Sequence, residues 1–269
     1  MLDRWKLWMT SQGLSVRTIT ERLSTIRALL AHAASDGVSL TPEDIQAYLA
    51  RAMSAATRAT YHATIRAFCA WMQRTGERPD NPADQTPRPR RPKSKPRPIE
   101  NTQLDALLRA ANRTRTRDYI MLAALAGLRV HEIAKIHGRD VDPYTNVLTV
   151  QGKGRKIAAI PLHDDLAPMV ARMPRTAFWF PTYTATRVEG HVSAHAVSGA
   201  IRGAMLRAGF DAKPHQLRHF YGTTLVRAGV HLRVVQELMR HESPATTAIY
   251  TEVDMHQLRE AIGQLRWAA

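Results

Sequence analysis

One stretch near the C-terminus organises this sequence: Lys213-Pro214-His215-Gln216-Leu217-Arg218-His219. Proline suits the first turn of a helix, so the stretch predicts a helix that starts at Pro214. His215, Arg218 and His219 then fall at positions i, i+3 and i+4, on one helical face. A guanidinium group presents permanently charged donors in a fork that matches phosphate oxygens, and an imidazole exchanges protons near neutral pH. This face therefore predicts a site suited to phosphate chemistry.

More side chains of this kind lie downstream and upstream of the stretch. Met239-Arg240-His241 and Thr246-Thr247-Ala248-Ile249-Tyr250 add a histidine and a tyrosine, a candidate nucleophile with its helper. Arg129 follows a predicted helix stop at Gly127, beside the start of the next helix, where free backbone N–H groups favour an anion. Gly-Leu-Arg is a common tripeptide, so this position carries weight only together with the others.

Two further residues have a structural interpretation beside the functional one. Glu132 is better interpreted as a capping residue, or as a partner that orients Arg129, than as an acid catalyst. Lys153 stands at the tip of the Gly-rich connection Gln151-Gly152-Lys153-Gly154-Arg155, from which a lysine can swing into a groove and deliver a proton. A plain solvated turn explains the same pattern, and only the other residues of the set favour catalysis.

The composition points to a polyanionic partner. The chain has 269 residues, with 38 Lys and Arg against 23 Asp and Glu, and its net charge of +15 makes nucleic acid the expected ligand. An apolar fraction of 44% is ample for a folded core. The single cysteine, Cys69, excludes an internal disulfide and a cysteine-cluster zinc site. Without a long apolar run or a signal-peptide pattern, we expect a cytoplasmic, nucleoid-associated protein of a bacterial cell with no membrane partner.

Hydrophobic periodicity predicts two folded units. Residues 1–83 form a small helical unit, because apolar residues recur at helical spacing behind caps at Ser15 or Thr18 and at Thr41. Residues 99–269 form a larger, mainly α-helical unit with a small β-sheet. The sheet is predicted from two β-type runs, 146–150 and 156–160, that flank the Gly-rich connection. A helix is predicted over residues 163–173.

Residues 84–98 differ from both units, because prolines interrupt them throughout and no acid follows Asp84. Proline disfavours helix and sheet, so we expect an extended, semi-stiff linker. Its basic side chains suit a strap along a phosphate backbone, and we predict that they bind DNA: Arg88, Arg90, Arg91, Lys93, Lys95 and Arg97. An ordinary soluble linker is the alternative, but joining two domains does not require so many basic residues.

Taken together, the motifs resemble those of the tyrosine recombinases, the phage integrase family. The resembling segments, in order, are Ala126-Gly127-Leu128-Arg129-Val130-His131-Glu132, Gly152-Lys153-Gly154-Arg155-Lys156, His215-Gln216-Leu217-Arg218-His219, and His241 with Tyr250. The resemblance covers nearly the whole chain. It implies a mainly α fold with a small β-sheet in a catalytic domain, residues 99–269. With a core-site-binding domain, residues 1–83, that domain would form a C-shaped clamp around duplex DNA.

The resemblance also implies a catalytic set: Arg129, Lys153, His215, Arg218, His241 and Tyr250. The two arginines would clamp the non-bridging oxygens of a phosphodiester, and Tyr250 would attack it to leave a 3′-phosphotyrosine. Lys153 would protonate the departing 5′-oxygen, and the two histidines would serve in proton transfer and hydrogen bonding. We expect no metal, ATP or other cofactor, because the covalent intermediate conserves the bond energy. Further DNA contacts are expected from Arg155, Lys156 and Arg240.

The implied partners are core-type attachment sites in double-stranded DNA and three further copies of the chain in a synaptic homotetramer. An accessory protein for excision or DNA bending is a further expected partner. An amphipathic helix predicted over residues 255–265 would pack onto a neighbouring protomer or onto its own domain, and the sequence does not decide between these. The core-binding helices start at about Leu2, so we expect no arm-binding domain, as in Xer recombinases and reduced integrases.

We therefore expect a site-specific recombinase that integrates or excises a phage genome or mobile element. Xer-like dimer resolution by the same chemistry is one alternative. A non-catalytic DNA-binding protein of recombinase fold is another, but it leaves the complete catalytic set unexplained. A zinc enzyme is also conceivable from His215-x-x-x-His219, although Gln216 stands where the metalloprotease helix has its general base.

Two positions depart from the family pattern. Where the pattern has Leu-Gly-His, this chain has Met239-Arg240-His241, and the arginine either adds a DNA contact or alters the helix turn. In the second strand of the predicted hairpin, an expected arginine is replaced by Ala158 or Ala159. The second departure puts one contact with the DNA backbone in doubt and touches no catalytic residue.

Overall fold

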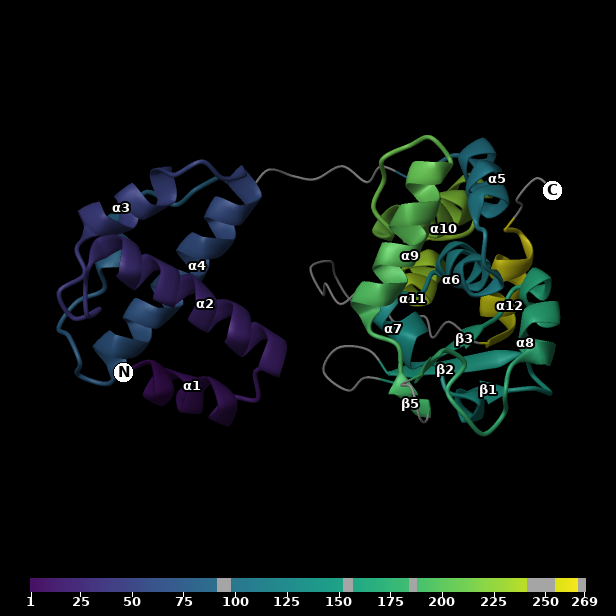
Figure 1. Cartoon of the computed structure of the whole chain (residues 1–269), viewed down its shortest axis with the longest axis horizontal. Helices are drawn as coiled ribbons and strands as arrows, with labels where there is room; N and C mark the ends of the chain where they lie inside the picture. The colour runs from purple at the N-terminus through teal and green to yellow at the C-terminus, as the bar shows by residue number, and fades with distance from the viewer. Residues whose placement is uncertain (91–97, 152–156, 184–187, 241–254, 266–269) are drawn as a thin grey trace. The chain divides into compact units, whose positions relative to one another are not determined.

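The computed structural model describes residues 1–90, 98–151, 157–183, 188–240 and 255–265 (Figure 1). The chain divides into two compact units, Met1–Lys95 and Pro96–Ala269. The fold is mainly α-helical with small antiparallel sheets, which confirms the predicted fold class. In the described part of the chain, no helix combines the length and the apolar character needed to cross a membrane.

The first unit is a bundle of four helices followed by a short 3-10 helix. They are α1 (Leu2–Ser11), α2 (Val16–Ala33), α3 (Pro42–Ala50), α4 (Ala55–Arg74) and the 3-10 helix Pro82–Gln85. Ser15 caps α2 by accepting a hydrogen bond from the Thr18 N–H, and Thr41 forms a capping box with Asp44, so both predicted caps are confirmed. Trp5 is fully buried, and its ring meets that of Phe68 at 4.9 Å between centroids.

The chain that leaves this bundle is fastened to α4 before it becomes proline-rich. The buried His62 side chain forms a 2.9 Å hydrogen bond between its Nε2 and Thr86 Oγ1, and Arg66 pairs with Asp84 at 2.5 Å. Beyond these contacts, Arg88 and Arg90 are exposed. The other basic linker residues lie outside the described residues: Arg91, Lys93, Lys95 and Arg97.

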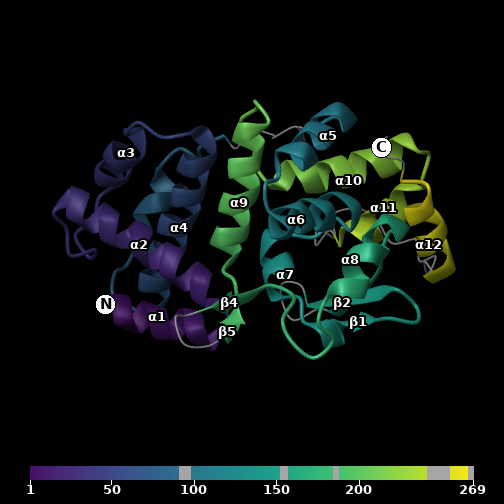
Figure 2. The ribbon, with the colours of Figure 1, turned by 45° about the vertical axis from the view of Figure 1, so that its right-hand side comes forward.

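The second unit is built around a buried central helix. Its helices are α5 (Asn101–Ala110), α6 (Thr114–Leu125), α7 (Val130–Lys135), α8 (Ala167–Arg172), α9 (Ala194–Arg207), α10 (His215–Arg227), α11 (Leu232–Met239) and α12 (Met255–Gly263). Helix α6 packs against α7, α9 and α10, and Figure 2 shows it in the middle of this unit. Most of its side chains are buried, which explains why its sequence has no polar face.

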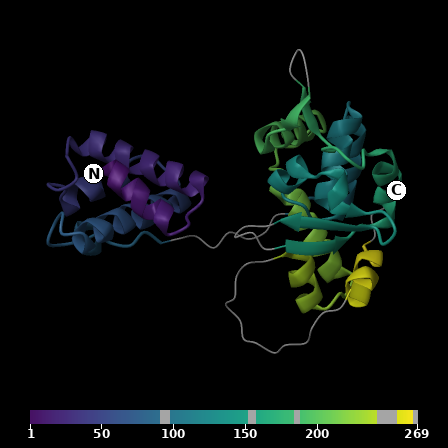
Figure 3. The same cartoon turned by 90° about the horizontal axis from the view of Figure 1, so that it is seen from below.

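A three-stranded antiparallel sheet lies below the helices in Figure 1 and is seen from below in Figure 3. Its strands are β1 (Val141–Asp142), β2 (Val147–Gln151) and β3 (Ile157–Pro161), in that order. Register runs from Val147 opposite Pro161 to Gln151 opposite Ile157, so the predicted pairing of the two β-type runs is confirmed. The connection with Lys153, Arg155 and Lys156 lies outside the described residues.

Two features of the second unit differ from the sequence prediction. A second antiparallel pair, β4 (Pro181–Tyr183) with β5 (Val188–His191), was not predicted, because these strands are too short to show an alternating pattern. The helix predicted over 163–173 is divided into a 3-10 turn, Asp164–Leu166, and α8. Pro168 accounts for this division, since proline occupies the first turn of α8 and donates no backbone hydrogen bond there.

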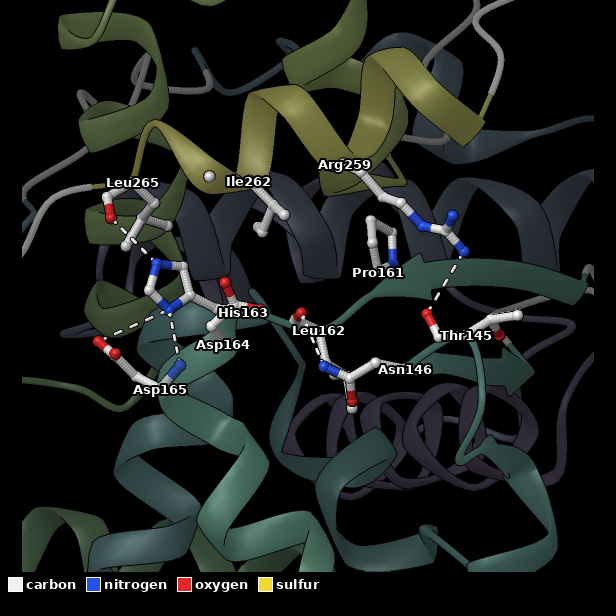
Figure 4. A pocket seen from close by; sticks show the side chains of 11 residues that line it. Thr145, Asn146, Pro161, Leu162, His163, Asp164, Asp165, Arg259, Ile262 and Leu265 are labelled. Atoms are coloured by element: carbon white, nitrogen blue, oxygen red, sulfur yellow. Dashed lines mark hydrogen bonds and ion pairs between the residues drawn. The ribbon is translucent and has the colours of Figure 1, made fainter.

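Helix α12 contacts its own chain in this structure, and its packing onto a neighbouring protomer stays a prediction. It contacts β3 and α11, and Ala261, Ile262 and Leu265 are buried. Figure 4 shows two contacts that hold this segment: Arg259 Nη2, in the middle of α12, donates to the Thr145 carbonyl at 3.3 Å, and His163 Nε2 lies 3.1 Å from the carbonyl of Leu265, just after the helix. A cavity of about 580 Å³ lies between α12 and the loops on either side of the sheet.

Candidate active site

Helix α10 carries the stretch that organises the sequence, but its polar residues do not all face the same environment. Pro214 caps the helix and His215 is its first residue. His215 is exposed, whereas Arg218 is only 2% exposed. The rings of His215 and His219 meet at 4.6 Å between centroids, and burial followed by the charge of Arg218 lowers the pKa of His219. The predicted face therefore has an outer imidazole, a second imidazole behind it, and a buried guanidinium.

The Arg218 guanidinium joins the ends of two other helices. Nη1 donates to the carbonyl of Gly127, just after α6, and Nη2 donates to the carbonyl of Met239, the last residue of α11. The last carbonyls of a helix have no partner within the helix and carry its negative dipole end, so they attract a cation. Arg218 is thus held at a point where α6, α10 and α11 meet.

Arg129 and Glu132 form a rigid pair at the start of α7. Glu132 Oε2 accepts the backbone N–H of Arg129 at 2.8 Å, and Oε1 accepts Nη1 of the same arginine at 2.9 Å. The glutamate side chain is 1% exposed and the arginine side chain 27%. The predicted role of Glu132 as a cap and an orienting partner is confirmed, and the arginine keeps one side open to solvent.

Arg240 directs its guanidinium toward Glu132 and Gly127, the residues that also contact Arg129 and Arg218. Nη2 lies 2.9 Å from Glu132 Oε2 and 3.2 Å from the Gly127 carbonyl, and the side chain is 10% exposed. Its own carbonyl accepts Nη2 of Arg129 at 3.3 Å. A direct contact with DNA by this guanidinium stays a prediction, because in the structure its donors face Glu132 and backbone carbonyls.

The cluster carries more positive than negative charge in a poorly solvated place. Arg129 and Arg240 pair with Glu132, and Arg218 donates to the same Gly127 carbonyl as Arg240. We call these four residues the arginine cluster, and its three cations and one carboxylate give a net charge of two positive. Burial, then repulsion from Arg240 and Arg129, lowers the pKa of Arg218 to about 9. Burial alone would raise the pKa of Glu132, but Arg240, the backbone N–H of Arg129 and its charge together lower it. An excess of desolvated positive charge is what a site for a phosphate transition state requires.

A cavity beside the cluster gives an anion access to it. Its volume is about 420 Å³, and its lining includes Arg129, His215, Lys213 and Arg202. These side chains come from the start of α7, the start of α10 and the exposed side of α9. A phosphate in this cavity would meet the open side of Arg129 and the exposed imidazole together.

The backbone conformation and close surroundings of Gly127 leave no room for a side chain, and this gives a first prediction. Its φ is +58°, and an added Cβ would lie 2.5 Å from Cδ1 of the fully buried Tyr221. We expect Gly127→Ala to destabilise the second unit by about 2–3 kcal/mol, because a left-handed residue and an overpacked ring each have a cost. Urea denaturation measures the change. Gly76→Ala is the matched control, since Gly76 also has positive φ, +76°, but open space at its Cβ. Equal losses in the two variants would contradict the packing argument.

The structure brings together part of the predicted set. Arg129 and His215 line one cavity. Arg129 and Arg240 are joined through Glu132, and Arg218 and Arg240 both donate to the Gly127 carbonyl. The remaining predicted catalytic residues, Lys153, His241 and Tyr250, lie outside the described residues. Among the described residues, no three His, Cys, Asp or Glu are grouped as a metal would require, so the zinc alternative lacks a third ligand there.

Sequence reasoning missed two contributors to this site. Tyr221 is fully buried against Gly127, and burial raises the pKa of its hydroxyl. The sequence also did not predict that the Arg240 side chain points into the protein, toward Glu132. The signal for both was present in part, because Phe220-Tyr221-Gly222 follows the motif in α10 and an arginine replaces the expected glycine before His241.

Sequence comparison identifies relatives of this chain over nearly its whole length. A sequence profile of the phage integrase family matches residues 97–257. The tyrosine recombinase XerD of Yersinia pestis is 30% identical over 94% of this chain and 92% of that protein. The tyrosine recombinase XerA of Pyrococcus horikoshii is 29% identical over 97% of this chain and 92% of that protein. The matched region includes the whole arginine cluster.

Comparison with solved structures also finds integrases. An integrase from mycobacterium phage Brujita is 42% identical, covers 99% of this chain and 92% of its own, and has a TM-score of 0.58. A lambda integrase dimer bound to a COC′ core site has a TM-score of 0.74 at 19% identity, covering 94% of this chain and 98% of its own. The second likeness shows that the two share a fold.

Proposed function

The chain belongs to the phage integrase family of tyrosine recombinases, and from this membership we propose that its arginine cluster holds the DNA phosphodiester that is broken and rejoined. The observation that carries the proposal is the buried excess of positive charge around Glu132, next to a cavity lined by Arg129 and His215. A phosphodiester attacked without a metal ion needs its developing charge neutralised by the protein, and arginine does this through paired hydrogen bonds.

The proposed roles of the two motif arginines, Arg129 and Arg218, differ because their side chains differ in exposure. Arg129, with its side chain 27% exposed, would receive the phosphate directly on its open side. Arg218 is almost fully buried and donates to two backbone carbonyls, which occupy two of its five N–H donors. A remaining N–H would bind a phosphate oxygen while the two carbonyls keep the guanidinium in place, and the charge of the phosphate makes this hydrogen bond a strong one.

The covalent step is carried by residues that the sequence motifs supply. The Tyr250 oxygen would form a bond to phosphorus while the bond from phosphorus to the 5′-oxygen breaks, leaving a 3′-phosphotyrosine. Lys153 would give a proton to the departing 5′-oxygen, and His215 would take part in moving the tyrosine proton. His241 would hydrogen-bond the same phosphate. A 5′-hydroxyl of another strand reverses these steps, so religation needs no external energy source.

DNA is gripped, in this proposal, by both units and the chain between them. The first unit would bind one side of a core-type site, with Arg88 and Arg90 leading the basic linker along the phosphate backbone. Four copies of the chain would act together on two sites, with an accessory protein for excision or DNA bending as a further expected partner.

Integration and excision of a phage or mobile element is the biological role that we favour. The support is the 42% identity to a phage integrase, compared with 30% to a Xer recombinase over a similar share of the chain. Xer-like dimer resolution is the second candidate, supported by the near full-length match to Xer proteins. Recombination assays with a phage-type pair of different sites and with two identical resolution sites distinguish them.

The test of the chemistry is a suicide DNA substrate, nicked near a candidate core site so that the cleaved strand cannot be rejoined. We expect the wild-type protein to form a covalent adduct that peptide mapping locates at Tyr250, and the Tyr250→Phe variant to form none. The adduct should form in the presence of EDTA. DNA retardation without any adduct, over several candidate sites, would support the non-catalytic DNA-binding alternative instead.

A further inference from the structure

Arg240 occupies a backbone position that favours glycine. It is the C-terminal cap of α11, with φ 48° and ψ 49°, which is the left-handed conformation. Glycine adopts this conformation without strain and other residues do so at a cost, which gives a physical reason for the glycine of the family pattern. Among the described residues, only Ala34 and Asn146 share a positive φ without being glycine. An arginine at this cap therefore needs a compensating contribution from its side chain.

The side chain supplies contacts that a glycine cannot. Nη2 reaches both the Glu132 carboxylate and the Gly127 carbonyl, and Nη1 lies 3.4 Å from the Leu238 carbonyl. Glu132 divides its two oxygens, because Oε1 receives Arg129 Nη1 while Oε2 receives Arg240 and the backbone N–H of Arg129. The carboxylate is therefore fixed from two sides.

We propose that Arg240 is a positioning residue of the recombination site: it locks Glu132, which in turn aims Arg129 at the phosphate, and it adds a third positive charge behind that phosphate. With Arg240 present, Glu132 is shared, and the cluster keeps two positive charges. With a glycine there, Glu132 would serve Arg129 alone and would cancel more of its charge. Arg240 itself need not touch the DNA.

The alternative is that Arg240 is only a helix cap whose side chain fills space. The two readings predict opposite results for Arg240→Gly. A mere cap should work as well or better with glycine, because the backbone strain is removed. A positioning residue should lose catalytic rate with glycine, even though the helix end is relaxed.

The experiment compares Arg240→Gly with wild type on the suicide substrate, at saturating DNA and in a single turnover. We expect the cleavage rate to fall by about 10- to 100-fold, the effect of misplacing a group that acts through another, with the Kd for uncleaved DNA within about twofold. Arg240→Lys should recover part of the rate, since it keeps the charge. Guanidinium ion at millimolar concentration should rescue Arg240→Gly and leave wild type unchanged.

Ala34→Gly is the matched control for the backbone, because Ala34 caps α2 with φ 49° and ψ 37° and is exposed. It should leave the cleavage rate unchanged. The inference rests on the proposed site, but the two fail differently. No adduct from the wild-type protein would remove the proposed function. Wild-type adduct with an equal rate in Arg240→Gly, or a loss of DNA affinity at unchanged rate, would overturn only the role given to Arg240. Should Arg240→Gly fold poorly, Arg240→Gln, with the same readouts, decides the question.

Discussion

Replacing Arg218 by methionine is expected to slow DNA cleavage by about 100- to 1,000-fold, the usual effect of removing one charge-stabilising donor at a transition state. Methionine retains much of the length and the apolar stem of arginine but offers no hydrogen to a phosphate oxygen. Affinity for uncleaved DNA should change little, because the side chain is only 2% exposed and the basic surface that grips the backbone stays intact. The readouts are the single-turnover rate of adduct formation and the Kd.

Arg218→Lys separates charge from geometry. Lysine keeps one positive charge but has no fork, so it cannot hold Gly127, Met239 and a phosphate together. We expect a rate between those of wild type and Arg218→Met. Arg227→Met is the matched control on the same helix, since the Arg227 side chain is 62% exposed and pairs with Glu100 at 3.1 Å. Cleavage by Arg218→Met at the wild-type rate would show that the buried cluster is not the phosphate site.

Much of the fold was accessible from the sequence because its signals are local. The Thr41 capping box needs only residues within one helical turn. The β2–β3 pairing follows from two β-type runs flanking a Gly-rich connection, and the alternating burial of β2 fixes which face packs inward. The helix at Pro214 likewise follows from proline and from spacing.

The arrangement of the site was less accessible because it depends on contacts distant in the sequence. Spacing put His215 and Arg218 on one face, but packing against α6 and α11 buried only the arginine. Arg240 appeared as a surplus basic residue in a basic chain. The inward direction of its side chain depends on the carboxylate of Glu132, more than a hundred positions away in the sequence. No local sequence pattern reveals a contact over that separation. Charge counts alone predicted a DNA contact.

Glu132→Ala is expected to destabilise the second unit by about 3–5 kcal/mol, because it leaves buried arginines without their counter-charge. The carboxylate is 1% exposed and holds Arg129 at 2.9 Å and Arg240 at 2.9 Å, so neither cation can be fully hydrated when the carboxylate is removed. Hydrogen exchange of amides in α6 and α7 reads the free energy of opening this unit. Asp211→Asn is the control, since its pair with Arg202 is exposed and should contribute little.

The pH dependence of the free energy of unfolding tests whether the charge of the Glu132 carboxylate stabilises the second unit. Because the folded protein lowers the pKa of Glu132 below its ordinary value of 4.5, its charge stabilises the fold fully above that pH. The stability is lost as the pH falls from about 4.5 through the lowered pKa. Glu132→Gln keeps the shape of the side chain and one oxygen for the Arg129 N–H, but it has no carboxylate to protonate. Its free energy of unfolding should therefore be lower than that of wild type at pH 7 and should fall less as the pH drops below 4.5. An acid-induced loss of the same size in Glu132→Gln and wild type would assign that loss to other carboxylates. The ion pairs of Glu132 would then not be what links the start of α7 to Arg240, the residue that ends α11.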